Sequence, residues 1–220
     1  MGMSELRRRV FWVCLYAVAM AAVESAVVVY LRALHPGDVP VTVLLSVIPN
    51  RLIPIELGRE AATIAMLLAV GILAGRDRWE RVLLFSMAFG AWDIFYYVWL
   101  WVFIAWPPSL LTWDVLFLIP VPWLGPVLAP VTVSVCLVGG SLWLLVRYIR
   151  GAPAGLPTFG WAAAVVGAVL VLLSFTLDSR YALERADPPG FRWGLFGSGV
   201  AISLAGVLTG ALRVRRTDSA

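Results

Sequence analysis

Apolar residues occur along this chain in six long blocks, which are separated by shorter segments that carry most of the arginines. Each block is about 20 residues long, the length that an α-helix needs to cross the hydrocarbon core of a bilayer. The blocks extend over residues 10–31, 56–75, 82–104, 126–147, 159–177 and 193–212. The pattern therefore predicts an all-α, polytopic transmembrane bundle of about six spans.

Two proline-containing stretches interrupt this pattern. The first, from His35 to Ile55, contains an apolar run at 41–48 that is too short to span a membrane, and we expect it at the interface. The second lies between Trp106 and Pro130, and prolines flank its segment Ser109–Ile119. As a helix this segment would reach only about 16 Å. We therefore expect a re-entrant or interfacial helix there, next to a cavity on the outer side, because irregular backbone in a membrane must be buried by protein or solvated.

The arginines predict how the bundle is oriented. With the N-terminus inside, eleven of the 17 arginines lie in cytoplasmic segments and six lie on the opposite side. Cytoplasmic segments of membrane proteins carry such an excess of positive charge. We therefore expect a multi-pass protein of a bacterial-type inner membrane, with residues 1–9 and 213–220 as cytoplasmic tails.

Composition supports one membrane domain over residues 1–220. Hydrophobic residues make up 61% of the chain and charged residues only 14%, whereas a soluble domain carries roughly 25% charged residues. The N-terminus resembles a signal peptide, with Arg7–Arg9 before an apolar run. That run continues to Leu31, which is long enough for a span, so we expect a retained first helix.

Charge and residue content exclude several function classes. The net charge is +4, but every basic residue is arginine and most lie beside apolar blocks, which is a topology signal and indicates no nucleic-acid partner. The chain has one histidine, His35, and its two cysteines, Cys14 and Cys136, lie inside apolar blocks. We therefore expect no zinc hydrolase site, no di-iron site with histidine ligands and no histidine-ligated haem. We expect no cofactor and no metal, with a carboxylate-bound divalent cation as the subsidiary alternative.

Carboxylates inside the apolar blocks are the strongest sign of function. Such residues are costly in a membrane and usually face the bundle interior. Glu24, Glu60 and Asp93 lie in the first three spans, and Asp114 lies in the predicted re-entrant segment. At the helical rise, Glu24 is about 10 Å and Glu60 about 6 Å below the outer surface. We therefore predict that these four carboxylates meet in one cavity that opens outward.

The start of the second span carries the densest polar pattern. Glu56, Arg59 and Glu60 are three and four residues apart, so they lie near one helix face. We predict a buried pair of Arg59 with Glu60, and an interfacial cap for Glu56, because acids favour helix N-termini. Glu24 also needs a partner, and Arg59 is the nearest candidate by depth.

Aromatic residues accompany two of the acids. Asp93 follows Trp92 and precedes Tyr96 and Tyr97, whose hydroxyls are expected to satisfy it, and the same rings suit a cage around a cation. Trp113 and Asp114 repeat the Trp-Asp pair. The candidate catalytic residues are therefore Asp93, Glu60 and Glu24. The candidate substrate-binding residues are Arg59, Asp114, Tyr96, Tyr97, Trp92 and Trp113.

Three functions fit these residues. The first is an intramembrane acid–base enzyme that acts on an amphipathic or isoprenoid-like lipid, with Asp93 or Glu24 as the acid. The second is a solute-binding membrane subunit or small transporter, and the third is a structural accessory subunit of a membrane complex. The expected partners are membrane lipid, an amphipathic or small-molecule ligand, and a membrane partner subunit. The alanine pairs Ala17/Ala21 and Ala22/Ala26 have the small-residue spacing that docks a partner helix.

Overall fold

The computed structural model describes residues 2–33, 52–184 and 190–217. The elements in chain order are α1 (Met3–Ala33), α3 (Ile53–Ala74), α4 (Arg78–Ile104), β1 (Trp113–Phe117), β2 (Trp123–Pro126), α5 (Leu128–Ile149), α6 (Thr158–Thr176), α7 (Ser179–Glu184) and α8 (Trp193–Thr217). Within these described residues, six helices are long and apolar enough to cross a membrane. The six predicted spans are therefore confirmed, and the chain is a multi-pass membrane protein.

The first and last helices extend further than their apolar blocks. The helix α1 begins at Met3, so Arg7–Arg9 lie within its first turns and are not part of a separate tail. The helix α8 likewise continues to Thr217. Arginine favours helix formation and can extend its charged group toward water, so it does not end a helix where an apolar block ends. The apolar run at 41–48, which we predicted to be interfacial, lies outside the described residues.

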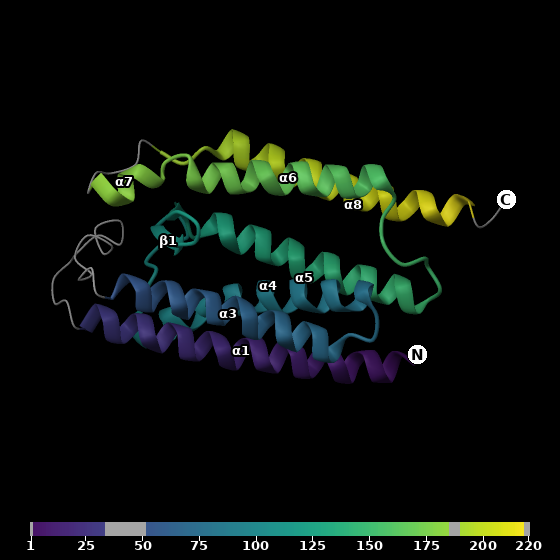
Figure 1. Ribbon diagram of the computed structural model, residues 1–220, viewed down its shortest axis with the longest axis horizontal. Helices are drawn as coiled ribbons and strands as arrows, with labels where there is room; N and C mark the ends of the chain where they lie inside the picture. Colours follow the sequence, from purple (N-terminus) through teal and green to yellow (C-terminus); the bar gives the residue numbers. More distant parts are fainter. Residues whose placement is uncertain (1, 34–51, 185–189, 218–220) are drawn as a thin grey trace.

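The helices form two groups (Figure 1). In the first, α4 packs against α1, α3 and α5, and in the second α6 packs along α8. Contacts of α5 with α8, and of β2 with both α5 and α6, join the two groups. Both chain termini lie at one end of the bundle, and the hairpin and α7 lie at the other (Figure 1).

Small residues let α1 and α4 approach closely. Ala17 and Ala21 of α1 are fully buried in the core. Two side chains cross this interface to backbone oxygens: the Ser25 hydroxyl donates to the Tyr96 carbonyl at 2.9 Å, and the Trp99 indole donates to the Val18 carbonyl at 3.0 Å. The expectation that Ala17 and Ala21 dock a partner helix is therefore met within the chain itself, because α4 packs on this face of α1.

The segment Ser109–Ile119 forms no helix, so that prediction is wrong. Its central residues form β1, which pairs antiparallel with β2 in a hairpin. The physical reason is local: the segment is rich in residues that favour strands, and prolines both precede it and fill the turn at Pro120 and Pro122. Hydrogen bonds between β1 and β2 satisfy backbone N–H and C=O groups of the hairpin. A short helix would have satisfied such groups through its own internal hydrogen bonds.

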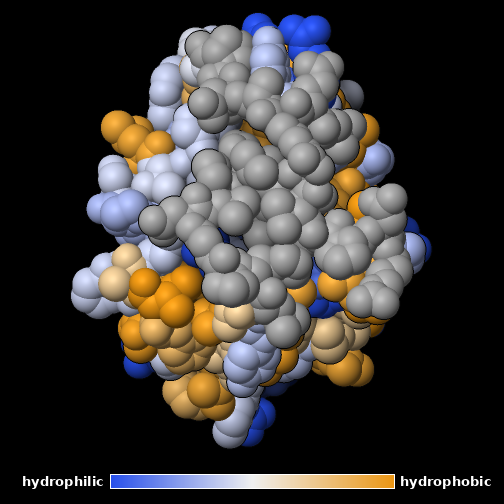
Figure 2. All heavy atoms as spheres, turned by 90° about the vertical axis from the view of Figure 1, so that its left-hand side faces the viewer, coloured by the Kyte–Doolittle hydropathy of each residue, from blue (hydrophilic) through white to orange (hydrophobic). Residues whose placement is uncertain are grey.

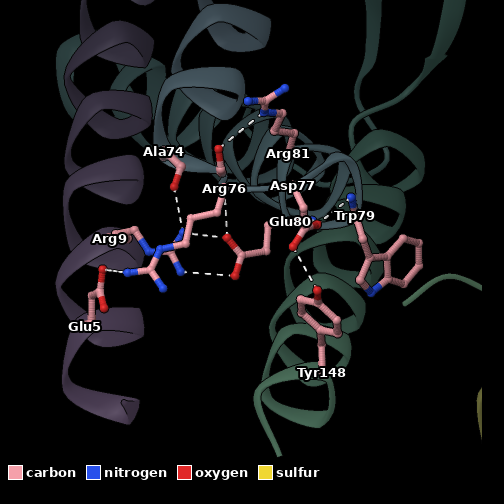
Figure 3. Close-up of polar contacts among 10 residues, drawn as sticks. Glu5, Arg9, Ala74, Arg76, Asp77, Trp79, Glu80, Arg81 and Tyr148 are labelled. Carbon is pink, nitrogen blue, oxygen red and sulfur yellow. Dashed lines mark hydrogen bonds and ion pairs between the residues drawn. The ribbon is translucent and has the colours of Figure 1, made fainter. Parts of the chain in front are cut away.

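A polar network ties the helices together at the end that carries the termini (Figure 3). Arg9 of α1 donates to both Glu80 carboxylate oxygens, at 2.7 and 3.2 Å, and to the carbonyl of Ala74 at 2.8 Å. Asp77 caps the start of α4 by accepting two backbone N–H groups, and it also accepts the Tyr148 hydroxyl of α5 at 2.8 Å. This network links α1, α3, α4 and α5.

The outer surface of the bundle is largely apolar. Large hydrophobic side chains with more than half of their surface exposed occur on α1, α3, α4 and α6, including Phe11, Leu73, Trp101 and Val165. Seen from the hairpin end, apolar side chains lie on several sides of the described part of the molecule (Figure 2). Such a surface suits contact with lipid tails.

Candidate functional site

A small polar cavity of about 100 Å³ lies near the hairpin, between α1, α3, α4 and β1. Its lining combines acids, arginines and aromatic rings that are up to 93 residues apart in sequence, from Glu24 to Phe117. Of the nine candidate site residues, eight line this cavity: Glu24, Arg59, Glu60, Trp92, Asp93, Tyr96, Tyr97 and Asp114. Trp113 does not, and its ring instead packs against Phe191 at a centroid distance of 6.1 Å.

Arg59 pairs with two buried carboxylates. It forms a close ion pair with Glu24 of α1, and its Nε lies 2.8 Å from the carboxylate of Glu56. The Thr63 hydroxyl also donates to Glu24 in a short contact. The pair of Arg59 with Glu24, which depth indicated, is therefore confirmed, whereas the predicted pair of Arg59 with Glu60 does not form. Glu56, which we expected to cap the helix at the interface, is only 7% exposed and belongs to the ion-pair cluster.

Glu60 holds the hairpin against α3. Both of its carboxylate oxygens accept the backbone N–H of Leu118, at 2.9 and 3.1 Å. Leu118 follows the last residue of β1, so its N–H has no partner in the strand ladder. The carboxylate supplies that partner, and a buried backbone donor without one would be costly. Glu60 is therefore a structural link between α3 and the hairpin as well as a wall of the cavity.

Asp93 receives its hydrogen bond from a helix that sequence spacing did not indicate. The Ser134 hydroxyl of α5 donates to Asp93 at 2.8 Å, so the expectation that Tyr96 or Tyr97 satisfies this acid is wrong. Gly90 makes the approach possible, because a Cβ at this position would lie 2.7 Å from the Ser134 carbonyl oxygen. Serine is common in transmembrane helices, and nothing in its sequence context singled out Ser134.

Asp114 faces Tyr97. It accepts the Tyr97 hydroxyl at 3.1 Å and the backbone N–H of Val115 at 3.0 Å, and it is 3% exposed. Burial raises the pKa of Asp114 to about 7, although the positive charge of Arg32 acts in the opposite direction. Arg32 is one of the six arginines expected on the outer side. Its guanidinium lies 4.1 Å from the Trp106 ring centre, and Arg32 lines the same cavity.

Trp92 contributes an unsatisfied donor. The residue is 6% exposed, and its indole N–H is buried without a hydrogen-bond partner among the described residues. The ring lies beside Tyr96, with centroids 6.3 Å apart, and Tyr96 lies beside Tyr97 at 5.0 Å. Three neighbouring aromatic rings therefore line the polar cavity, and one of them carries a buried N–H without a partner among the described residues.

A second, larger cavity of about 430 Å³ lies between α4 and α5 on one side and α6 and α8 on the other. Its lining is almost entirely apolar, from Phe89 and Trp123 through Val171 to Leu204. Asp93 and Leu116 line both cavities. The Asp93 carboxylate is therefore part of the wall between a charged chamber and an apolar one.

The acids of the described residues do not form a recognisable metal centre. No group of three or more His, Cys, Asp or Glu side chains in the described residues has an arrangement suited to a metal ion. Cys14 and Cys136 are free thiols on α1 and α5. The chemistry that the described side chains offer is proton exchange, charge pairing and contact with aromatic faces.

No protein-family model, curated protein or solved structure matches this chain. The site therefore has to be interpreted from its own geometry. That geometry is a multi-pass helical bundle in which buried carboxylates from α1, α3, α4 and β1 surround one small cavity beside a larger apolar one.

Proposed function

We propose that this protein is an intramembrane acid–base enzyme that acts on an amphipathic, isoprenoid-like lipid. Asp93 carries this proposal, because it lines both the polar and the apolar cavity. A lipid with its chain in the apolar cavity and its head in the polar one would bring the junction between them next to the Asp93 carboxylate. Acid–base chemistry requires such a group within reach of the proton that it transfers.

The sizes of the two cavities favour a lipid over a small solute. Ligand pockets usually measure about 300–1,000 Å³ and are mostly apolar with a few polar groups. The apolar cavity, at about 430 Å³, lies in this range, whereas the polar cavity, at about 100 Å³, is much smaller. Together the two chambers fit a molecule that is mostly chain with a compact head.

The hydrogen bonds suggest different roles for the acids. Glu24 and Glu56 both form ion pairs with Arg59, so we assign them to a structural charge cluster and do not assign either of them as the catalytic acid. Asp93 accepts only the neutral Ser134 hydroxyl among the bonds of the described residues. We therefore assign Asp93 as the proton-transferring group. Asp114, with its pKa near neutrality and its bond to Tyr97, is the second candidate for proton exchange.

Deuterium transfer tests this proposal. The purified protein is reconstituted in vesicles of a total bacterial lipid extract in D₂O, and lipid masses are followed over time. Proton transfer at carbon should place solvent deuterium in one lipid class. Asp93→Asn is nearly isosteric and should reduce this labelling by roughly 10²-fold or more. Asp178→Asn changes a buried acid that lines neither cavity, so it is the matched control.

Two results would contradict the enzyme proposal. One is the absence of lipid deuteration by the folded wild-type protein. The other is equal labelling by wild type and Asp93→Asn, with both variants showing the same melting temperature. Either result would favour the second candidate, a small-solute binding subunit or transporter, for which the small charged cavity by itself is the supporting observation.

A further inference from the structure

We propose that the polar cavity selects a lipid head that carries an amine, bound as an ammonium ion with an oxygen atom next to it. This inference rests on the proposed lipid function and specifies the class of lipid. It depends on the charges that line the cavity, on the neighbouring aromatic rings, and on the buried N–H of Trp92.

The charges around the cavity are unbalanced. Five carboxylates and two guanidinium groups line it. Arg59 is engaged by Glu24 and Glu56, and the guanidinium of Arg32 lies over the ring of Trp106. An ammonium ion in the cavity would reduce this excess of buried negative charge, which is otherwise costly in an apolar environment.

Three of the carboxylates have only neutral donors. Among the described residues, Glu60 accepts the Leu118 N–H, Asp93 accepts the Ser134 hydroxyl, and Asp114 accepts the Tyr97 hydroxyl and the Val115 N–H. None of the three forms an ion pair with a described arginine. Each carboxylate keeps further acceptor capacity, which an ammonium group with its N–H donors can use.

The aromatic rings point to the same ligand. Trp92, Tyr96 and Tyr97 line the cavity beside these acids, and the faces of such rings attract cations. The Trp92 side chain is more than nine-tenths buried, and its N–H has no partner within the described residues. Because an N–H can only donate, it calls for an acceptor atom in the ligand, and an ammonium nitrogen has no free lone pair for this. A hydroxyl oxygen beside the amine meets the requirement.

Binding of matched single-chain probes to the protein in nanodiscs tests the inference. The probes are octadecylamine, octadecanol, octadecanoic acid and the amino alcohol of the same chain length. The amine should bind about tenfold or more tightly than the alcohol, as expected for a charge-assisted hydrogen bond, and the acid should bind most weakly. Asp93→Asn and Asp114→Asn should each reduce the advantage of the amine. Asp178→Asn, which changes an acid outside both cavities, should not.

Trp92→Phe tests the acceptor. It keeps an aromatic ring but removes the N–H, so it should abolish any extra affinity of the amino alcohol over the amine. If the wild-type protein binds the amino alcohol no more tightly than the amine, the proposal of an oxygen atom next to the amine is wrong. Likewise, an extra affinity that survives in the folded Trp92→Phe variant would overturn the assignment of this donor.

The failure of this inference and that of the lipid function give different results. Ala162 and Ala168 of α6 are both exposed, but only Ala168 lines the apolar cavity. Ala168→Trp should therefore block chain binding, and Ala162→Trp should not. Equal binding of amine and alcohol, with both lost in Ala168→Trp, would overturn the amine and keep the lipid function. Binding of none of the probes to folded wild-type protein would overturn both. If the protein still prefers the amine after Ala168→Trp, the amine binds without its chain in the apolar cavity. This result would indicate a site for free amines and would contradict the proposed lipid function.

Discussion

At the residue scale, Arg59 compensates two buried acids that come from different helices. Arg59→Ala would leave Glu24 and Glu56 without their cation, and breaking a buried ion pair from one side costs on the order of 3 kcal/mol. We expect a marked fall in melting temperature in detergent. The triple variant Glu24→Gln, Glu56→Gln and Arg59→Gln removes all three charges, so it should recover much of the loss.

Arg150→Ala is the control for this prediction, because Arg150 is exposed at the end of α5 and a change there should stay within about 0.5 kcal/mol. If the triple variant were no more stable than Arg59→Ala, uncompensated charge would not be the cause of the loss. The loss would then come from the packing of the Arg59 side chain itself.

The raised pKa of Asp114 predicts how the stability of the protein depends on pH. Burial raises its pKa from 3.8 to about 7, so between these values the folded state holds a proton that the unfolded state has lost. Stability should therefore decrease as pH rises through this window and level off above about pH 7, by on the order of 2–4 kcal/mol in total. Melting curves from pH 4 to 8 measure this effect. Asp114→Asn cannot lose a proton, so a difference between the two proteins that stays constant with pH would contradict the prediction.

At the scale of elements, glycines determine how closely α6 and α8 pack. A Cβ on Gly199 would lie 2.7 Å from the Gly167 carbonyl oxygen, so the helices can meet here only without side chains. Gly199→Ala should destabilise the protein by about 1–3 kcal/mol, the usual cost of overpacking. It should also alter the apolar cavity, because that cavity is lined by Ala168 and Val200, which directly follow Gly167 and Gly199 in the chain.

Gly197, two residues away on α8, is the matched control. A Cβ there would meet no atom within 4 Å, so Gly197→Ala should be neutral or slightly stabilising because alanine favours helix. Thermal unfolding of both variants under the same conditions measures the difference. Similar melting temperatures for the two would show that α6 and α8 do not depend on this close approach.

The length and the prolines of the segment Ser109–Ile119 do not determine whether it forms a helix or the first strand of the hairpin. A short apolar segment between prolines is compatible with a helix or with a strand, and its period does not separate the two. The deciding factor is a partner strand that follows the turn, together with Glu60 of α3, which accepts the N–H beyond the strand end. These contacts come from other parts of the chain.

At the scale of the whole molecule, the arginine distribution predicts the orientation in the membrane. Reporter fusions after Arg78 and Arg150 should report cytoplasm, and a fusion after Glu184 should report the outer side. Cysteine at Leu111, an exposed residue before β1, should react with an impermeant reagent from outside only. A cytoplasmic reaction at Leu111, or an outer signal after Arg150, would reverse or break this topology.

The sequence by itself determined the class of the fold and the residues worth attention. Each span is visible because hydrophobicity is a property of a continuous block, and the acids of α1, α3 and α4 stand out because charge is costly inside such a block. Depth along each helix then indicated that Glu24, Glu60 and Asp93 could meet, since the helical rise converts residue number into height.

Only the tertiary structure decided which groups bind each other. Depth along the helices indicated Arg59 for Glu24, but it did not indicate that the second partner of Arg59 is Glu56 and not Glu60. It also did not indicate that Ser134, 41 residues away on another helix, binds Asp93. Such choices depend on how each helix is rotated and how closely it approaches its neighbour, which close contacts at small residues such as Gly90 allow. The apolar cavity follows from the same cause, because it exists only where α6 and α8 meet α4 and α5.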